Sequence, residues 1–181
     1  MTHPDIAYVV HIVSQFMAAS RTIHFTAVLR ILRYIKGTLG HGLQFSSQSS
    51  LVLSGYSDAD WARDPTDRTK SEYHALADTI AELLWLCWLL ADMGVPQQGP
   101  TLLHCDNRSA IQIAHNDIFH ECTKHIENDC HFIRHHLLSN TLLLQSVSTT
   151  EQPADIFTKV LPSTRFNQLR TKLKLTVTLP P

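Results

Sequence analysis

The sequence predicts an α/β protein, because segments typical of strands alternate with segments of helical periodicity after residue 50. Two further features accompany this pattern. Acidic residues stand where predicted strands end, and a pair of predicted helices precedes the first strand. With 181 residues, 44% of them hydrophobic and 17% charged, the chain has the length and composition of one globular domain with an appended segment.

Two helices are predicted before the first strand. Residues 4–18 carry apolar side chains at helical spacing after Pro4, which the first turn of a helix tolerates. Residues 24–36 have an apolar face with basic side chains largely opposite, and glycines follow. A polar run at 46–50 then predicts a boundary, so residues 1–45 form a separate helical segment.

The chain after this boundary predicts three strands and five helices. The strands are expected at 51–62, 100–105 and 141–148, and the helices at 72–93, 107–115, 124–138, 153–161 and 163–174. We assign residues 51–160 to an α/β domain and residues 161–181 to a C-terminal helix and tail.

The most apolar stretch, at 83–91, predicts a buried helix face and no membrane association. Its nine residues are fewer than the 18 or so that a membrane span needs. Trp85 and Trp88 stand among leucines and are expected in the core, although exposed tryptophans could stack on nucleic-acid bases.

The cysteines and the first residues predict an intracellular protein. The four cysteines form no CxxC pair, which argues against a secreted disulfide framework. Residues 1–20 lack the charged start and small-residue cleavage site of a signal peptide. Nothing in the sequence distinguishes cytoplasm from nucleus, and the net charge of −1 gives no global sign of nucleic-acid binding.

Four acidic residues are candidates for chemistry. Asp58 and Asp106 end predicted strands, while Glu72 and Asp155 open predicted helices. In open α/β sheets the strand ends are where sites form. Clustered carboxylates repel one another unless a cation neutralises them, and hard oxygen ligands suit Mg²⁺, with Mn²⁺ as an alternative. Two such ions about 4 Å apart would stabilise attacking and leaving oxygens in phosphodiester cleavage. Taken singly, each acid could instead be a helix cap or a solvated charge.

Seven segments, in their order along the chain, resemble the C-terminal part of the Pol polyprotein of copia-type LTR retrotransposons. They are DIAYVVHIVSQFM, AVLRILRYIKGTL, GYSDADWA, SEYHALADTIAELLWL, CDNRSAIQIA, TKHIE and ADIFTK. The resemblance covers residues 2 to about 175. It implies that residues 1–45 follow a reverse transcriptase core, and that residues 51–160 have a ribonuclease H-like fold. The implied activity is two-metal hydrolysis of RNA in RNA–DNA hybrids, and the implied partners are that hybrid and the rest of the polyprotein.

The resemblance also assigns residues to the catalytic site. Asp58 matches the first catalytic aspartate, which would bridge both metals, and Asp60 is its neighbour without being a ligand. Glu72, in SEY, matches the glutamate of the family's AEY motif. Asp106, in CDN, matches the third acid, and Asp155, in ADIFTK, matches the last.

Further residues are expected near the substrate or are weighed for other roles. The resemblance places His125 near the substrate, and we add Asn107 and Lys124 as substrate-binding candidates. The cysteines and histidines at 120–136 lack the spacing of a closed zinc site. The chain has no YxDD motif, which excludes polymerase activity in this chain.

Two predicted helices are basic. Their side chains could contact phosphates in the full polyprotein, or could simply form a solvated face. They are Arg30, Arg33 and Lys36 in the first helix, and Arg165, Arg170, Lys172 and Lys174 in the second.

The chain departs from the family between its first two catalytic acids. Only residues 59–71 separate Asp58 from Glu72, whereas the family has two further strands there. Two strands of about five residues with their turns do not fit, although an extended link could span about 46 Å. We therefore expect a three-stranded remnant whose first strand, with Leu51, Val52 and Leu53, is an exposed edge. Such an edge predicts lower stability or pairing with another chain.

The short link also leaves a second function open. The chain could be a non-catalytic transposon relic that at most binds nucleic acid. For a relic we expect hybrid cleavage no faster than that of an Asp58→Asn variant.

Overall fold

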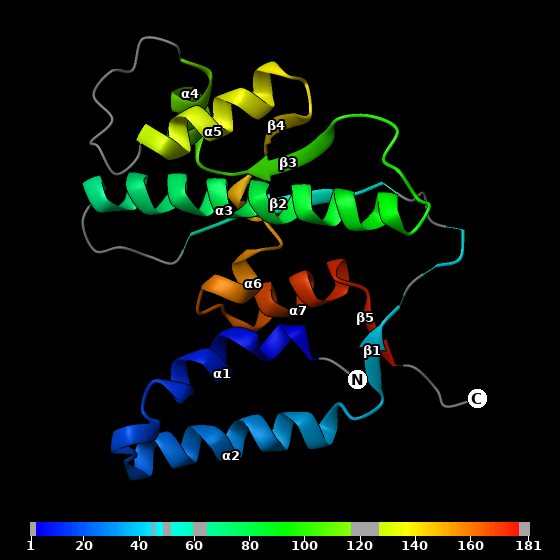
Figure 1. The fold of residues 1–181 in the computed structure, drawn as a ribbon. Coiled ribbons are helices and arrows are strands. Elements are labelled where there is room, and N and C mark those ends of the chain that lie inside the picture. Colours follow the sequence, from blue (N-terminus) through cyan, green and yellow to red (C-terminus); the bar gives the residue numbers. More distant parts are fainter. Residues whose placement is uncertain (1–2, 45, 49–51, 60–64, 117–126, 178–181) are drawn as a thin grey trace. The chain divides into compact units, whose positions relative to one another are not determined.

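The computed structural model describes residues 3–44, 46–48, 52–59, 65–116 and 127–177 (Figure 1). These residues form two compact units. Unit 1 combines residues 1–49 with residues 155–181, and unit 2 comprises residues 50–154. The division near residue 50 falls in the polar run at 46–50, whereas unit 2 ends at 154, six residues before the predicted domain end at 160.

Unit 2 contains a parallel sheet of three strands. These are β2 (Ser54–Ser57), β3 (Thr101–Cys105) and β4 (Leu142–Ser146), in the order β2-β3-β4. All three lie within the predicted segments, but β2 has only four residues where twelve were predicted. Val52 and Leu53 precede it, and Leu51 lies outside the described residues. Among the described strands β2 forms one edge of the sheet, as the short link predicted.

Helices of unit 2 pack around this sheet. They are α3 (Pro65–Asp92), α4 (Arg108–His115) and α5 (Glu127–Leu138), with the short 3-10 helix η3 (Thr149–Glu151) after β4. α3 contacts β2, β3, α4 and α5. Its buried side chains Leu76, Ile80 and Leu83 recur at helical spacing and meet Leu103 and Ile133 in the core.

A glycine in β2 allows α3 to lie close to the sheet. A Cβ atom at Gly55 would be 2.8 Å from Leu83 Cδ1, so a larger residue would force that leucine to shift. The close approach fixes α3 against the strand that leads to Asp58.

The start of α3 differs from the prediction. Glu72 was expected to open the helix, but α3 begins at Pro65 and places Glu72 about two turns inside. Several residues of the segment DPTDRTK, at 64–70, are typical of turns. Proline is also favoured in the first turn of a helix, because its missing N–H has no partner there, and α3 begins at Pro65.

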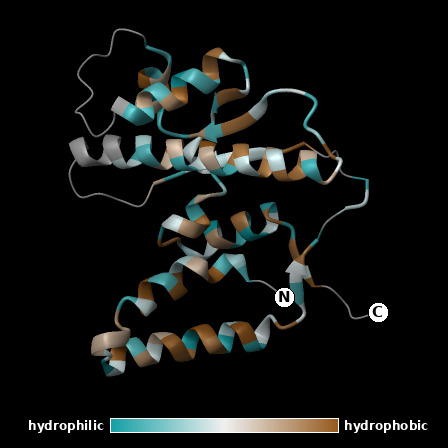
Figure 2. Cartoon of the chain, in the orientation of Figure 1, coloured by the Kyte–Doolittle hydropathy of each residue, from teal (hydrophilic) through white to brown (hydrophobic). Residues whose placement is uncertain are grey.

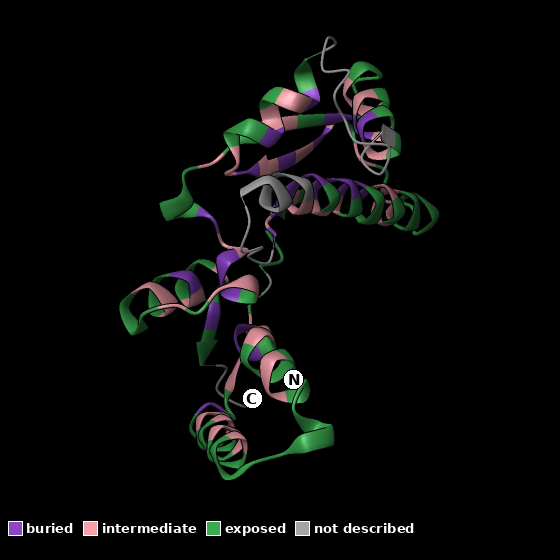
Figure 3. Cartoon of the chain, turned by 90° about the vertical axis from the view of Figure 1, so that its left-hand side faces the viewer, coloured by how far each residue is buried: buried purple, intermediate pink, exposed green. Residues whose placement is uncertain are grey.

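The prediction of a buried face at 83–91 is wrong for the tryptophans. Trp85 is 53% exposed and Trp88 is 67% exposed. Figure 3 shows buried positions giving way to exposed ones toward the C-terminal end of α3. The buried leucines occupy one side of the helix, and the three-stranded sheet covers only that side.

One described helix segment, Ser71–Asp92, is long and apolar enough to cross a membrane, judged by length and composition alone. The same criterion is met by core helices of soluble proteins, so it is weak support for a membrane span.

Unit 1 is built from short helices and a two-stranded ladder. One helix was predicted over residues 4–18, but the structure has three short elements there: η1 (Pro4–Ile6), α1 (Ala7–Ser14) and η2 (Met17–Ala19). The remaining elements are α2 (Thr22–Gly37), β1 (His41–Leu43), α6 (Asp155–Thr158), α7 (Ser163–Lys172) and β5 (Leu175–Val177).

The pairing of β1 with β5 was not predicted. These strands are antiparallel, with Gly42 opposite Thr176, and they join the two chain segments of unit 1. Three residues are too few to show the alternation by which strands are recognised in a sequence. α1 and α2 contain no buried residue, so unit 1 has a much smaller core than unit 2.

The packing of unit 2 predicts that alanine substitutions at two of its leucines differ strongly in their effect on stability. Leu76→Ala, at a fully buried position, should lower the free energy of unfolding by about 2–5 kcal/mol, because it leaves a cavity against the sheet. Leu138→Ala, at a position that is 82% exposed in the same unit, should change it by less than about 0.5 kcal/mol. Chemical denaturation followed by circular dichroism measures both, and equal losses would contradict the packing described.

Candidate metal centre

Three of the four predicted acids come together at one end of the sheet. One carboxylate oxygen from each of Asp58, Glu72 and Asp106 lies within 4.8 Å of the other two. Asp58 directly follows β2 and Asp106 directly follows β3. These strands are parallel and in register, with Ser57 opposite Cys105, so the chain delivers both aspartates to the same edge.

The environment of this cluster is desolvated and negative. Glu72 is buried, while Asp58 and Asp106 are partly buried. Burial, and to a smaller extent the negative charges of the three carboxylates, raises the pKa of the neighbouring Cys105 thiol to about 11. A hydrogen bond from the thiol to the Asn107 carbonyl opposes this rise.

Two neighbouring residues hold the ends of the strands in place. Gln152, which is fully buried, donates a hydrogen bond from Nε2 to the carbonyl oxygen of Ser57 at 3.0 Å. Asn107 accepts a hydrogen bond from the Ala110 backbone N–H at 3.0 Å and caps α4 directly after Asp106. The structure thus gives the Asn107 side-chain oxygen a capping role, and its contact with substrate stays a prediction.

Sequence reasoning missed the role of Gln152 and the contact between the His74 ring of α3 and the Asp129 carboxylate of α5. The partner of Gln152 is a backbone carbonyl 95 positions away, which leaves no pattern in the sequence. His74 lies two positions after Glu72, and its pairing with Asp129 links the helix that carries Glu72 to α5.

The fourth predicted acid, Asp155, belongs to unit 1. It is buried at the start of α6, where Lys159 Nζ lies 2.6 Å from Oδ1 and an Arg165 Nη atom lies 3.5 Å from Oδ2. The group of three acids in unit 2 does not include it. Its assignment as a metal ligand stays a prediction, as do those of His125 and Lys124, which lie outside the described residues together with Asp60.

Among the described histidines and cysteines, no group is arranged to bind a metal ion. Cys130 is buried in the core of unit 2. His131 and His135 are exposed on the same helix. His120 and Cys122 lie outside the part of the chain that the structure describes.

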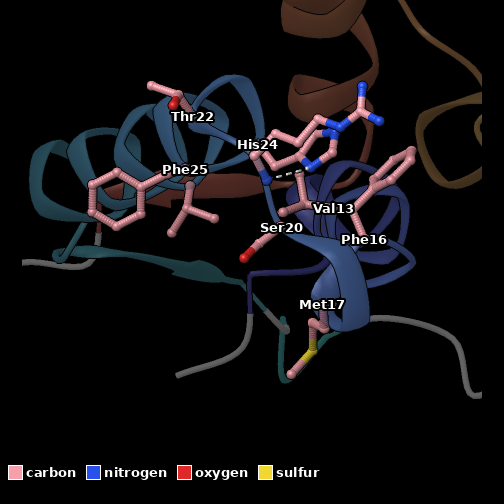
Figure 4. Close-up of a pocket in the computed structure, with 9 residues that line it drawn as sticks. Val13, Phe16, Met17, Ser20, Thr22, His24 and Phe25 are labelled. Atoms are coloured by element: carbon pink, nitrogen blue, oxygen red, sulfur yellow. Dashed lines mark hydrogen bonds between the residues drawn. The ribbon is translucent and has the colours of Figure 1, made fainter.

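Two cavities are formed by described residues of unit 1. The first, about 440 Å³, lies between α1 and α2 and is lined by apolar and polar residues, among which Phe16 stacks on His24 with ring centroids 4.2 Å apart (Figure 4). The second, about 590 Å³, has the buried Asp5 carboxylate in its lining. Tyr34 of α2 donates a hydrogen bond to Asp5. Neither cavity brings together acids or nucleophiles as the end of the sheet does.

Comparison with known proteins identifies relatives over nearly the whole chain. The chain is 36% identical to the retrovirus-related Pol polyprotein from transposon RE1 of Arabidopsis thaliana, over 97% of its length. It is 34% identical to the corresponding polyprotein from transposon RE2 of the same plant, over 99% of its length. It is 35% identical to that from transposon TNT 1-94 of Nicotiana tabacum, over 91% of its length. The chain spans 14% of each of these polyproteins.

These alignments contain more positions than there are residues of this chain in them, so the relatives have residues that this chain lacks. The RE1 alignment runs over 204 positions and includes 97% of this chain, or about 176 of its 181 residues, so roughly 28 positions have no counterpart here. The RE2 alignment, over 209 positions and about 179 residues of this chain, leaves roughly 30. No family model matches the chain, and no solved structure matches it.

Replacing one carboxylate of the acid cluster by an uncharged amide should stabilise the protein. In EDTA, Asp106→Asn should raise the melting temperature by about 2–4 °C, because it removes one of three like charges within 4.8 Å. Asp78→Asn, at an exposed acid of α3 outside the cluster, should leave it unchanged. Differential scanning calorimetry at low protein concentration measures both. A lower melting temperature for Asp106→Asn in EDTA would show that the three charges do not repel one another.

Proposed function

Because nearly the whole chain is homologous to part of the retrovirus-related Pol polyproteins of transposons, we propose that it supplies a ribonuclease H activity. The reaction is hydrolysis of the RNA strand in an RNA–DNA hybrid. The observation that carries this proposal is the cluster of Asp58, Glu72 and Asp106 at the end of the parallel sheet. The remainder of the polyprotein is the expected covalent partner, since the chain spans only part of its relatives.

The residues of the cluster fit a divalent cation. All three donors are carboxylate oxygens, the hard ligands that Mg²⁺ and Mn²⁺ prefer, and their mutual distances bring the negative charges close enough to need neutralising. Asp58, Glu72 and Asp106 would hold the ion, and Asp155 is the candidate for a fourth ligand. When bound, such ions supply the positive charge that favours attack of water on a phosphodiester.

The protein contributes by fixing these carboxylates in advance. Pairing of β2 with β3 sets the spacing of Asp58 and Asp106, and Gln152 anchors the last carbonyl of β2. Glu72 is held by a continuous helix that packs on the same two strands. Sites carried by paired strands and a packed helix keep their geometry better than sites on loops. Asp58 and Asp106 are only partly buried, which leaves the cluster accessible to a nucleic-acid strand.

A second candidate function is supported by the reduced sheet. The relatives carry roughly 28 residues without a counterpart in this chain, which is more than two strands of about five residues with their turns require. We place this loss at the short link after Asp58. Without that part of the sheet, the chain would be a relic that at most binds nucleic acid and does not cleave it.

Cleavage of a labelled RNA–DNA hybrid distinguishes the two functions. With Mg²⁺ or Mn²⁺ present, an active chain should lose about 100-fold or more of its rate in Asp58→Asn and in Asp106→Asn, because each removes a cluster carboxylate. Asp92→Asn, at the exposed end of α3, is the matched control and should keep the wild-type rate. Equal rates for the wild type and Asp58→Asn would reject the enzyme and support the relic.

A further inference from the structure

α3 carries an exposed stripe that its own unit does not cover. Asp78, Glu82, Trp85 and Leu89 recur at spacings of four, three and four residues, which places them along one side of the helix. All four are exposed, and this side lies opposite the buried leucines of α3. We call these four residues the acidic stripe. Its N-terminal half is charged and its C-terminal half is apolar.

α2 carries an exposed stripe of the opposite charge. Phe25, Leu29, Arg33 and Lys36 recur at spacings of four, four and three residues and are all exposed. We call them the basic stripe. Its N-terminal half is apolar and its C-terminal half is charged, so its polarity along the helix is the reverse of the acidic stripe. Figure 2 shows strongly hydrophobic residues along α2 and along the later part of α3.

We propose that the basic stripe of one copy of this chain docks on the acidic stripe of a second copy, with the helices antiparallel. This arrangement sets Phe25 against Leu89 and Leu29 against Trp85. One turn further along, it sets Arg33 against Glu82 and Lys36 against Asp78. The apolar contacts supply the affinity and the ion pairs set the direction, because surface ion pairs alone contribute little. A parallel arrangement would place charges against apolar side chains.

The charges favour a second copy of this chain, over a nucleic acid or a lipid surface, as the partner of the acidic stripe. Between residues 71 and 92, α3 has acidic residues and no lysine or arginine, so a nucleic acid would be repelled from the acidic stripe. Two carboxylates in the stripe also oppose insertion into lipid. Within the described residues, none of Arg33, Lys36, Asp78 and Glu82 forms an ion pair, so all four are available to a partner.

Sedimentation equilibrium of the full chain tests the proposal. The wild type should show a monomer–dimer equilibrium in the micromolar range that weakens at high salt. The double variant Arg33→Glu/Lys36→Glu should raise the dimer dissociation constant at least about tenfold, because like charges then face each other. Adding Asp78→Lys and Glu82→Lys to that variant restores opposite charges and should recover the wild-type constant. Circular dichroism verifies that each variant is folded.

Arg30→Glu provides the matched control. Arg30 lies on the same helix with the same charge, but it lines the cavity beside Tyr34 and is outside the basic stripe. The Arg30→Glu variant should therefore leave the dimer dissociation constant unchanged. A chain that stays monomeric at all concentrations would overturn the proposal, as would failure of the fourfold variant to recover or an equal effect of Arg30→Glu. Binding of the monomer to phosphatidylcholine vesicles would also overturn it in favour of a lipid surface.

Discussion

The register between β2 and β3 is the constraint on which the rest of the site depends. Because Ser57 lies opposite Cys105, the next residue of each strand is an aspartate, and both leave the sheet at the same edge. A slip of one residue would turn one of these side chains to the other face. α3 completes the arrangement by packing on the same strands and bringing Glu72 to the two aspartates. The hydrophobic core of unit 2 thus serves to hold three mutually repelling charges together.

Much of this arrangement could be predicted from the sequence, because it follows from local patterns. The strand-end rule placed Asp58 and Asp106 at one site, and the resemblance of SEY to the family's AEY motif placed Glu72 with them. The start of α3 could not be predicted, since Pro65 in a stretch of turn-forming residues is compatible with a turn and with a first helical turn. Gln152 and the β1–β5 ladder depend on contacts between distant parts of the chain, which a single sequence does not reveal.

The exposure of Trp85 and Trp88 could not be predicted for another reason, which is the small size of the sheet. A run of leucines and tryptophans in a helix normally predicts burial, but a helix is buried only where the protein has surface to cover it. A sheet of three strands covers one side of α3 and leaves the other side open, and the C-terminal half of that open side is apolar. The alignment with the RE1 polyprotein leaves roughly 28 positions without a counterpart in this chain. An exposed stripe of this kind favours association with another protein surface.

The central claim is that Asp58, Glu72 and Asp106 form a divalent-cation site, and metal-induced stabilisation tests it most directly. Thermal unfolding of the full chain is followed in EDTA and with increasing Mg²⁺ or Mn²⁺. A site that binds only in the folded state should stabilise the wild type by about 2.7 kcal/mol at a metal concentration 100 times the dissociation constant. The Asp58→Asn variant should lose this gain. No stabilisation of the wild type, or the same stabilisation in Asp58→Asn, would contradict the account.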